Sequence, residues 1–350
     1  MTAAEILSLR LSNHQLAGTK VQQPHDLVSW MGAMQSQNFE MAKWGIGCRM
    51  PYITDKKLNK ALDKGDIIRL HILRPTWHFV SKNDIHWMLD LSSPRLKRVL
   101  SSNDKELELS DTLIKKTNSI IEKELEGKSL TREELKIIIN DAGIIADNRR
   151  VYHIMFRAEV YGLVCNGALK GKKQTYALLE EKVPKTVDTF DRDESLYKLA
   201  YKYFQSHGPA TPQDFIWWSG LTTAESRRAI ELIKDDFVFE VVGDQVYIFH
   251  RASIPTKAVN LINLLPAFDE FIVSYKDRKE TLHADHHKKI ITSPGTFQPS
   301  ICKDGKTIGS WRKLPNSKQI SISTEHFYPC NKSTEKLIEK ASDRFRSYFS

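Results

Sequence analysis

The sequence lacks the features that direct a chain to a membrane, to secretion or to a metal. It contains no run of about 18 apolar residues, so no membrane-spanning helix is expected. Residues 1–6 include no basic segment followed by an apolar core, so no secretory signal is predicted. The four cysteines lie far apart and form no Cys-x-x-Cys pair, which argues against a zinc ribbon or a redox couple; they are Cys48, Cys165, Cys302 and Cys330. We therefore expect reduced thiols in a cytoplasmic protein.

The composition is that of a globular protein with a basic surplus. The chain has 350 residues, of which 27% are charged and 41% hydrophobic, and this length predicts two to three folding units. The net charge of +9 indicates a polyanionic partner. Residues 1–100 carry 14 basic against 8 acidic side chains and residues 251–350 carry 17 against 10, whereas the middle of the chain is neutral to acidic. The two ends should therefore contribute to one nucleic-acid surface, unless the lysines are merely solvated.

Residues 194–250 have the pattern of a winged helix. Helical apolar spacing in Ser195–Phe204 is followed by a Thr211-Pro212 helix start and by a third helix, Thr223–Lys234. Two strands then follow, Phe237–Val242 and Gln245–Phe249, joined by a Gly-Asp turn. Three helices followed by a hairpin predict a winged helix.

Two further copies are predicted upstream. In the second, a capping box in Ser129–Leu135 precedes a helix at Arg149–Val164 and a wing with turns near Asn166 and Lys170. The looser first copy covers residues 2–81, and an interrupted linking helix, Asn83–Asn103, breaks at Pro94. The elements expected in the first copy are the helices Ala3–Ala17, Pro24–Met34 and Thr54–Leu62 and the strands Ile67–His71 and Thr76–Val80.

The last hundred residues predict a β-rich domain that ends in a helix, Thr334–Tyr348. The expected strands are Phe271–Tyr275, Ser300–Cys302, Thr307–Arg312 and Gln319–Ser323, with a hairpin turn at Lys303–Lys306. The predicted fold is therefore α+β, with tandem winged-helix motifs and a C-terminal β-rich domain. The expected units are residues 1–103, 104–190, 191–255 and 256–350.

The most informative short motif is the pair Gln35 and Gln37. Residues at i and i+2 point the same way on an extended chain, so both amides project into one space if the preceding helix ends near Met34. By spacing alone, two solvated surface amides would be the ordinary interpretation.

Several motifs together resemble one known family, the AlkZ/YcaQ-type winged-helix DNA glycosylases, over nearly the whole chain. They are Met34–Gln37, Leu73–His78, Leu264–Phe271 with Tyr275–Arg278, and Asp304-Gly305 leading to Gly309–Arg312. In that family a Gln-x-Gln or Gln-x-Asp pair carries catalysis, which implies that Gln35 and Gln37 are catalytic. Ser36 departs from the family pattern, in which the middle residue is usually aliphatic.

The resemblance implies a monofunctional DNA glycosylase that hydrolyses the N-glycosidic bond of N7-alkylated purines in double-stranded DNA. Such purines are charged and leave readily, so two amides that hold a water and face C1′ can suffice. Bulky lesions, interstrand crosslinks among them, would be processed without deep base flipping. No lysine stands out as a Schiff-base former. We expect no cofactor, a monomer and a cytoplasmic, nucleoid-associated base-excision-repair enzyme.

Further residues are candidates for contact with DNA. Arg74 and His78 lie on the first wing, where a structural histidine is the alternative for His78. The others lie on the second wing or in the basic C-terminal block: Lys170, Lys172, Lys173, Lys276, Arg278 and Arg312. A solvated turn is the alternative for the three wing lysines, and structural ion pairs, such as Arg278 with Asp269, are the alternative for the C-terminal residues.

Two other groups are interpreted as structural. Arg227 and Arg228 lie on the third helix of an acidic winged helix, which favours a scaffold over a groove reader. The cluster His283–His287 has no supporting ligand set, so no metal site is predicted.

Two rival functions remain open at this point. A non-enzymatic DNA-binding protein, such as a transcription regulator, would use the same winged helices, and a drug-sequestering or structural protein could keep the fold without chemistry. The acidic third unit and the lack of a long dimerisation helix count against a regulator. Gln35 and Gln37 distinguish the enzyme from both rivals.

Overall fold

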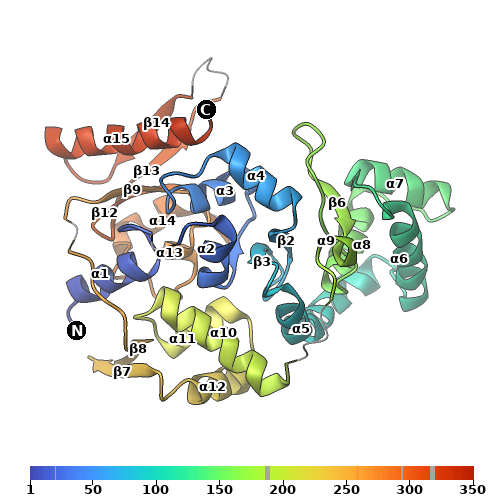
Figure 1. Ribbon diagram of the computed structural model, residues 1–350, viewed down its shortest axis with the longest axis horizontal. Coiled ribbons are helices and arrows are strands. Elements are labelled where there is room, and N and C mark those ends of the chain that lie inside the picture. Colours follow the sequence, from blue (N-terminus) through green and yellow to red (C-terminus); the bar gives the residue numbers. More distant parts are fainter. Residues whose placement is uncertain (20, 186–189, 258, 293–294, 316–319) are drawn as a thin grey trace.

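The computed structural model describes residues 1–350 apart from residues 20, 186–189, 258, 293–294 and 316–319. Helices and antiparallel sheets alternate along the chain, which confirms the α+β fold. The lobe built from residues 111–182 lies at one end of the long axis, and the N-terminus lies toward the other end (Figure 1). Within the described ranges, no helix combines the length and the apolar character that a membrane crossing requires.

The first unit places the glutamine pair on the edge of a small sheet. Its elements are α1 (Ala3–Asn13), α2 (Pro24–Met31), β1 (Met34–Gln35), α3 (Phe39–Gly47), α4 (Asp55–Asp63), β2 (Ile67–His71) and β3 (Trp77–Ser81). The strands are antiparallel in the order β1-β3-β2, and Gln35 lies opposite His78.

Three details of this unit differ from the sequence prediction. The first two helices end earlier than expected, because Gln15 (φ 58°) and Gly32 (φ 75°) adopt a left-handed backbone that cannot continue a helix. Helix α3 was not predicted, although Asn38 caps it by accepting a hydrogen bond from the Met41 amide.

The linking helix α5 (Ile85–Glu106) continues through Pro94, so the predicted interruption is wrong. On one side of the proline, Leu91 belongs to a buried cluster shared with α10 (Arg192–His207). On the other side, Leu96 packs with residues of α8 (Asn148–Val160). Packing on both sides of Pro94 thus outweighs the one backbone hydrogen bond that proline removes.

The second and third units follow the helix–helix–helix–hairpin order of winged helices. The second has α6 (Asp111–Leu125), β4 (Leu130–Thr131), α7 (Arg132–Asp141), α8, β5 (Val164–Asn166), β6 (Thr175–Leu178) and α9 (Leu179–Lys182). Thr131 and Glu134 form the expected capping box, but α8 ends before Val164 because Gly162 turns the backbone at φ 72°. The third has α10, α11 (Pro212–Ser219), α12 (Thr223–Leu232), β7 (Phe237–Val242) and β8 (Gln245–His250), as predicted.

The C-terminal part contains a four-stranded antiparallel sheet in the order β14-β13-β12-β9, covered by α15 (Figure 1). Its elements are β9 (Ile262–Leu265), α13 (Glu270–Val273), the short 3-10 helix η1 (Ala284–His286), α14 (His287–Ile290), β10 (Ile291–Thr292), β11 (Thr296–Phe297), β12 (Ser300–Lys303), β13 (Lys306–Lys313), β14 (Ile322–His326) and α15 (Lys332–Tyr348). The predicted turn at Lys303–Lys306 joins β12 to β13.

Two strand predictions in this part need correction. The segment predicted as the strand Phe271–Tyr275 begins instead as helix α13, since Asp269 caps it by accepting a hydrogen bond from the Phe271 amide. A short, fully buried apolar run does not distinguish helix from strand by periodicity. The last strand covers Ile322–His326 rather than Gln319–Ser323, and Gln319 lies outside the described residues.

Buried contacts join the two ends of the chain. One hydrophobic cluster combines residues 11–79 with residues 264–348, whereas residues 109–178 of the second unit have a cluster of their own. Arg49 forms two hydrogen bonds with Asp269, at 2.8 and 2.9 Å, with both side chains buried. Trp44 Nε1 donates to the carbonyl of Leu264 at 2.7 Å. These contacts fix the first unit against the C-terminal sheet. The division of the chain into four units stays a prediction.

Candidate active site

Gln35 and Gln37 both face the loop and strand that follow β2. The side-chain oxygen Oε1 of Gln35 accepts a hydrogen bond from Arg74 Nη2 at 3.0 Å. Oε1 of Gln37 accepts one from the backbone N–H of Trp77, also at 3.0 Å. Gln35 is buried and Gln37 half-buried. Each amide oxygen keeps one further lone pair, so each can accept a second hydrogen bond from a water or a substrate.

Ser36 fixes the backbone between the two glutamines. Its amide donates to the carbonyl of Trp77 at 2.7 Å, and its carbonyl accepts from Arg69 Nε and Nη2 at 3.2 and 2.9 Å. The hydroxyl of Ser36 is buried and has no hydrogen-bond partner among the described residues. The side chain thus points into packing, away from the two amides, as the position of an aliphatic residue requires.

Arg74 and His78 form the polar wall behind Gln35. His78 Nδ1 donates to the carbonyl of Thr76 at 2.9 Å, which leaves Nε2 to accept from Arg74 Nη2 at 3.4 Å. Burial and the charge of Arg74 lower the pKa of His78 to about 3, so the imidazole is neutral near pH 7. Burial also lowers the pKa of Arg74. The structure therefore brings both predicted residues to the glutamine pair, with His78 in a structural environment.

A buried carboxylate, Glu270, supports the strand that carries Gln35. Its Oε1 accepts the backbone N–H of Gln35 at 2.5 Å, and its Oε2 accepts from Trp218 Nε1 at 3.1 Å and from the Ser274 hydroxyl. Burial alone would raise the pKa of this carboxyl, but His207, Arg74 and Ser274 outweigh it and lower the pKa to about 2. An ionised carboxylate therefore lies beside Arg74 and compensates part of its charge.

A cavity of about 540 Å³ opens beside Arg74, between the loop after β2, α5 and α11. Its wall carries three cationic side chains, Arg74, Arg95 and Lys276. Its apolar lining includes Trp217, which is 42% exposed. Cations beside an exposed aromatic ring are the combination that binds phosphates and nucleobases.

The predicted DNA-binding residues are only partly gathered around this cavity. Lys276 lines it, while Arg278 is half-buried, with its guanidinium 5.6 Å from the Trp217 ring and with Nε donating to the Ile272 carbonyl. Burial lowers the pKa of Arg278 to about 10. Arg278 does not pair with Asp269: its Nε and Nη1 donate to the carbonyls of Ile272 and Lys276, while Asp269 binds Arg49.

The remaining basic candidates lie apart from the glutamine pair. Lys170 forms an ion pair with Glu134, and Lys172 and Lys173 are exposed on the wing of the second unit. Arg312 is exposed on β13.

The structure gives no binding role to Arg228 or to the histidine cluster His283–His287. Arg228 forms an ion pair with Asp193, as expected for a scaffold. His286 of the histidine cluster stacks on Phe327. Across the described part of the chain, no three His, Cys, Asp or Glu side chains are grouped to hold a metal ion.

Comparison with known proteins decides the family. The family model described as "DNA glycosylase AlkZ-like" matches residues 28–348. This chain belongs to the AlkZ-like DNA glycosylase family. The family consists of hydrolases of N-glycosyl bonds, which makes the chain an enzyme rather than a winged-helix regulator.

Two relatives extend the comparison. This AlkZ-like chain is 21% identical over 306 residues to an interstrand DNA cross-link repair glycosylase of Streptomyces sahachiroi, covering 82% of this chain and 81% of the relative. The solved structure of the Streptomyces sahachiroi DNA glycosylase AlkZ superposes with a TM-score of 0.80 at 18% identity, covering 99% of this chain and 97% of that chain. The fold is therefore shared from end to end.

Sequence reasoning missed two residues that touch the candidate site of this AlkZ-like glycosylase. Glu270 lies within the motif Leu264–Phe271, but nothing in that motif indicates a role for this carboxylate. Arg69 holds the Ser36 carbonyl, donates to Gln174 of the second unit and lies 4.6 Å from the Trp77 ring. Both act across units, so no local spacing pattern indicates them.

Proposed function

We propose that this AlkZ-like enzyme is a monofunctional DNA glycosylase that hydrolyses the N-glycosidic bond of N7-alkylated purines in double-stranded DNA. Gln35 and Gln37 position the attacking water and direct their amide oxygens toward C1′. The observation that carries the proposal is the fixed orientation of both amides by Arg74 Nη2 and the Trp77 N–H, each at 3.0 Å.

The chemistry needs little beyond these dipoles. An N7-alkylated purine already carries positive charge, so it leaves without protonation by an acid, and the sugar passes through an oxocarbenium-like state. Fixed amide oxygens stabilise that positive charge, and because they are already oriented they do not reorganise during the reaction. The spare lone pair on each oxygen can also accept a hydrogen bond from the attacking water and so orient it, while the proton that this water loses is released to solvent.

DNA binding is proposed at the cavity beside Arg74. Arg74 is half-buried and lines this cavity, so the part of its guanidinium that faces the cavity can take a backbone phosphate in addition to Gln35. Lys276 and Arg95 line the same cavity. We also propose phosphate contacts for Arg278 and Arg312 and for the wing residues Lys170, Lys172 and Lys173.

A monofunctional reaction fits the neighbours of the two glutamines. Among the described residues, the groups that hydrogen-bond to the side chains of the pair and to the Gln35 amide are Arg74, Trp77 and Glu270, and none of these is a lysine amine that could form a Schiff base. Water is then the nucleophile and an abasic site is the product.

We extend the proposal to bulky N7 adducts, interstrand crosslinks among them. A relative of this chain is named for cross-link repair. A base that is tied to the opposite strand cannot enter a closed pocket. The cavity beside Arg74 lies at the surface rather than inside a core, and this allows the lesion to be attacked without deep flipping.

The proposal is tested with methylated duplex DNA. We expect the wild type to release 7-methylguanine and expect Gln35→Ala and Gln37→Ala to lose at least about 100-fold in single-turnover rate, the range of a lost preorganised hydrogen-bonding group. Duplex affinity, measured by fluorescence anisotropy, should change less than about 3-fold. Retention of the wild-type rate by both variants would refute the catalytic assignment.

The lesion class is separated from the catalytic assignment by a second substrate. If wild type releases no 7-methylguanine, an N7-crosslinked duplex is offered to the same three proteins. Unhooking by the wild type and not by Gln37→Ala would place the chemistry at the pair and restrict the substrate to bulky lesions. Inactivity on both substrates with intact DNA binding would favour a chain that keeps the fold without chemistry.

A further inference from the structure

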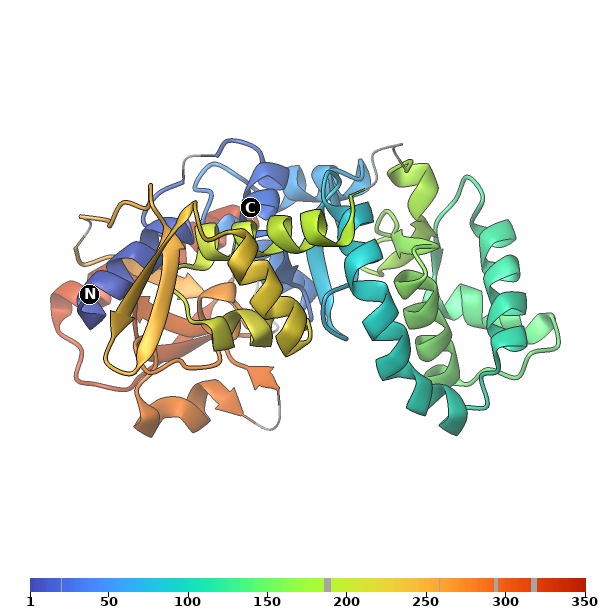
Figure 2. The same ribbon diagram turned by 90° about the horizontal axis from the view of Figure 1, so that it is seen from below.

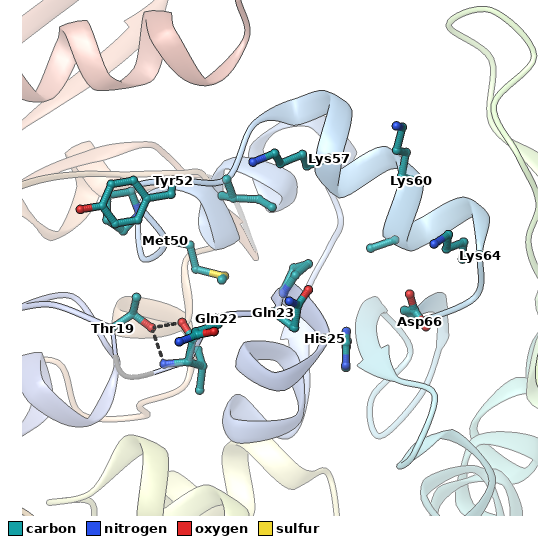
Figure 3. Close-up of a pocket in the computed structure, with 15 residues that line it drawn as sticks. Thr19, Gln22, Gln23, His25, Met50, Tyr52, Lys57, Lys60, Lys64 and Asp66 are labelled. Carbon is teal, nitrogen blue, oxygen red and sulfur yellow. Dashed lines mark hydrogen bonds between the residues drawn. The ribbon is translucent and has the colours of Figure 1, made fainter.

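A second hollow, of about 730 Å³, lies at the opposite end of α2 from the glutamine pair. We call it the α4 groove: it is bounded by Gln22–His25 at the start of α2, by Met50–Ile53 after α3, and by one face of α4 (Figure 3). None of its lining residues lines the cavity beside Arg74. Helix α2 begins at the groove and ends four residues before Gln35, and its eight residues span about 12 Å.

Three lysines form a row along the groove. Lys57, Lys60 and Lys64 stand three and four residues apart on α4 and its helical cap residue, so they occupy one face of the helix (Figure 3). Seven residues of helix rise about 10 Å, which is the length of about three nucleotides along one strand of B-form DNA. The row therefore matches successive phosphates of one strand.

The charge of this row is not neutralised by neighbouring carboxylates. All three lysines are exposed, and within the described residues none of their ammonium groups forms a hydrogen bond or an ion pair. Two carboxylates near the row have other partners, since Asp55 pairs with Lys43 and Asp66 pairs with Lys82 at 2.7 Å. The exposed Asp63 on α4 forms no ion pair with the row among the described residues. Although Asp66 lies near Lys64 in the lining, a polyanion bound here would meet three cations that form no ion pair within the described residues.

The rest of the groove offers surfaces for a base. Tyr52 stands beyond one end of the lysine row (Figure 3). Its side chain is 88% exposed, which is unusual for a large aromatic ring. Gln22 and Gln23 present exposed amides, which can donate and accept hydrogen bonds at a base edge. Met50 supplies a buried apolar floor.

We propose that the α4 groove binds single-stranded DNA, with phosphates on Lys57, Lys60 and Lys64 and a base stacked on Tyr52. A row of cations next to an exposed aromatic ring is the arrangement with which proteins bind unpaired strands, because only an unpaired base offers its face. A duplex opened beside a lesion presents such a strand. The proposal does not depend on the glycosylase reaction, because binding is measured on DNA without a lesion.

The test measures binding of a fluorescein-labelled 12-nucleotide thymidine strand by anisotropy, as a function of salt. The triple variant Lys57→Gln, Lys60→Gln, Lys64→Gln should bind at least about 10-fold more weakly. The magnitude of the slope of log affinity against log salt concentration should fall by about 2, because each of the three lost phosphate contacts accounts for about 0.7 on a single strand. Tyr52→Ala should weaken binding about 5-fold or more, and Tyr52→Phe should restore it.

A matched control removes the same charge elsewhere. Lys115, Lys116 and Lys123 are exposed on α6 of the second unit, and their triple change to Gln should leave strand binding within about 2-fold of wild type. An equal loss in this control would show that only net charge matters and would overturn the proposal. Unchanged binding by Tyr52→Ala, or a loss confined to blunt duplex DNA, would overturn the assignment of a single strand.

Discussion

At the scale of the residue, the candidate site depends on side chains that hydrogen bonds fix in one orientation, and not on side chains that change protonation near neutral pH. Gln35 and Gln37 carry no charge, His78 is neutral, and the charged neighbours Arg74 and Glu270 both hydrogen-bond to Gln35. The site thus presents oriented dipoles to the substrate while its ionised groups stabilise one another. This division predicts different effects for changes to the glutamines and for changes to their supports.

Glu270 should be a positioning residue. Glu270→Gln replaces one acceptor oxygen by an NH2 group, which would then face the N–H of Gln35 or of Trp218, both of which are donors. The change also removes the negative charge that compensates Arg74. We expect the free energy of unfolding to fall by about 3 kcal/mol. Urea denaturation measures it, with exposed Glu122→Gln as a control that should change less than about 0.5 kcal/mol.

The excision rate distinguishes a positioning role from a purely structural one. In the fraction of Glu270→Gln that stays folded, the single-turnover rate should fall while the affinity for duplex DNA stays close to wild type. An unchanged rate in folded protein would mean that Glu270 supports the fold only.

The buried histidines predict how stability depends on pH. The pKa of His78 is about 3 in the folded state and about 6.5 in a free side chain, so the unfolded chain binds more protons between these values. The contribution of neutral, buried His78 to the free energy of unfolding is therefore complete above pH 6.5 and is lost as the pH falls toward 3. His14 and His207 are also buried with lowered pKa values and act in the same direction.

Thermal denaturation between pH 7 and pH 4 checks this prediction. The Tm of the wild type should fall with decreasing pH, and His78→Gln should show a shallower fall because one titrating group is gone. A steeper or identical slope in the variant would contradict the neutral assignment of His78.

At the scale of the element, the position of Arg74 depends on how α11 ends. Gly220 closes α11 with a φ of 68°, and a Cβ at this position would lie 2.6 Å from the carbonyl oxygen of Leu73 and 3.0 Å from Arg74 Cγ. Only glycine allows both the left-handed backbone and this close approach. The third unit thereby sets the place of the loop that holds Gln35.

Gly220→Ala should therefore affect both stability and catalysis. We expect a loss of about 2–4 kcal/mol from backbone strain and displacement of the loop, together with a lower excision rate. Gly243→Ala is the control: its φ is 62°, but a Cβ there meets no atom within 4 Å, so it should cost only about 1 kcal/mol and leave excision unchanged. Equal effects of the two changes would show that the contact with Leu73 is unimportant.

At the scale of the whole molecule, distant segments of the chain meet at the candidate site. Gln35 comes from the first unit, Glu270 from the C-terminal part, and Arg69 binds Gln174 of the second unit. Figure 2 shows the second unit and the C-terminal part on opposite sides of the first unit, with β2 and β3 between them. The site is therefore a property of the assembled chain rather than of one winged helix.

The ion pair between Arg49 and Asp269 tests this assembly. Both side chains are buried, so Arg49→Met leaves an uncompensated carboxylate and should lower the free energy of unfolding by about 3–5 kcal/mol. Arg149→Met, which breaks the exposed pair with Glu106, should cost less than about 1 kcal/mol. Urea denaturation of both variants gives the comparison, and similar small losses would mean that the two ends are held mainly by apolar packing.

Local pattern accounts for much of the fold. The elements of the third unit follow from capping residues, a proline at a helix start and a Gly-Asp turn, all of which act within a few residues. The same local reasoning found the capping box at Thr131 and the hairpin at Lys303–Lys306. It was wrong at Pro94, where packing against distant elements outweighs the local preference, and at Phe271–Tyr275, where periodicity does not distinguish a short buried helix from a strand.

The sequence by itself determined the winged-helix pattern and placed the glutamine pair on extended chain after a helix, because side-chain spacing and caps are encoded locally. Only the tertiary structure decided which groups hold Gln35 and Gln37. The partners of the Gln35–Gln37 segment include Arg74 and Trp77, about 40 residues away, and Glu270, 235 residues away. Contacts at such separations depend on how whole units pack, and no periodicity in a single sequence reports that packing.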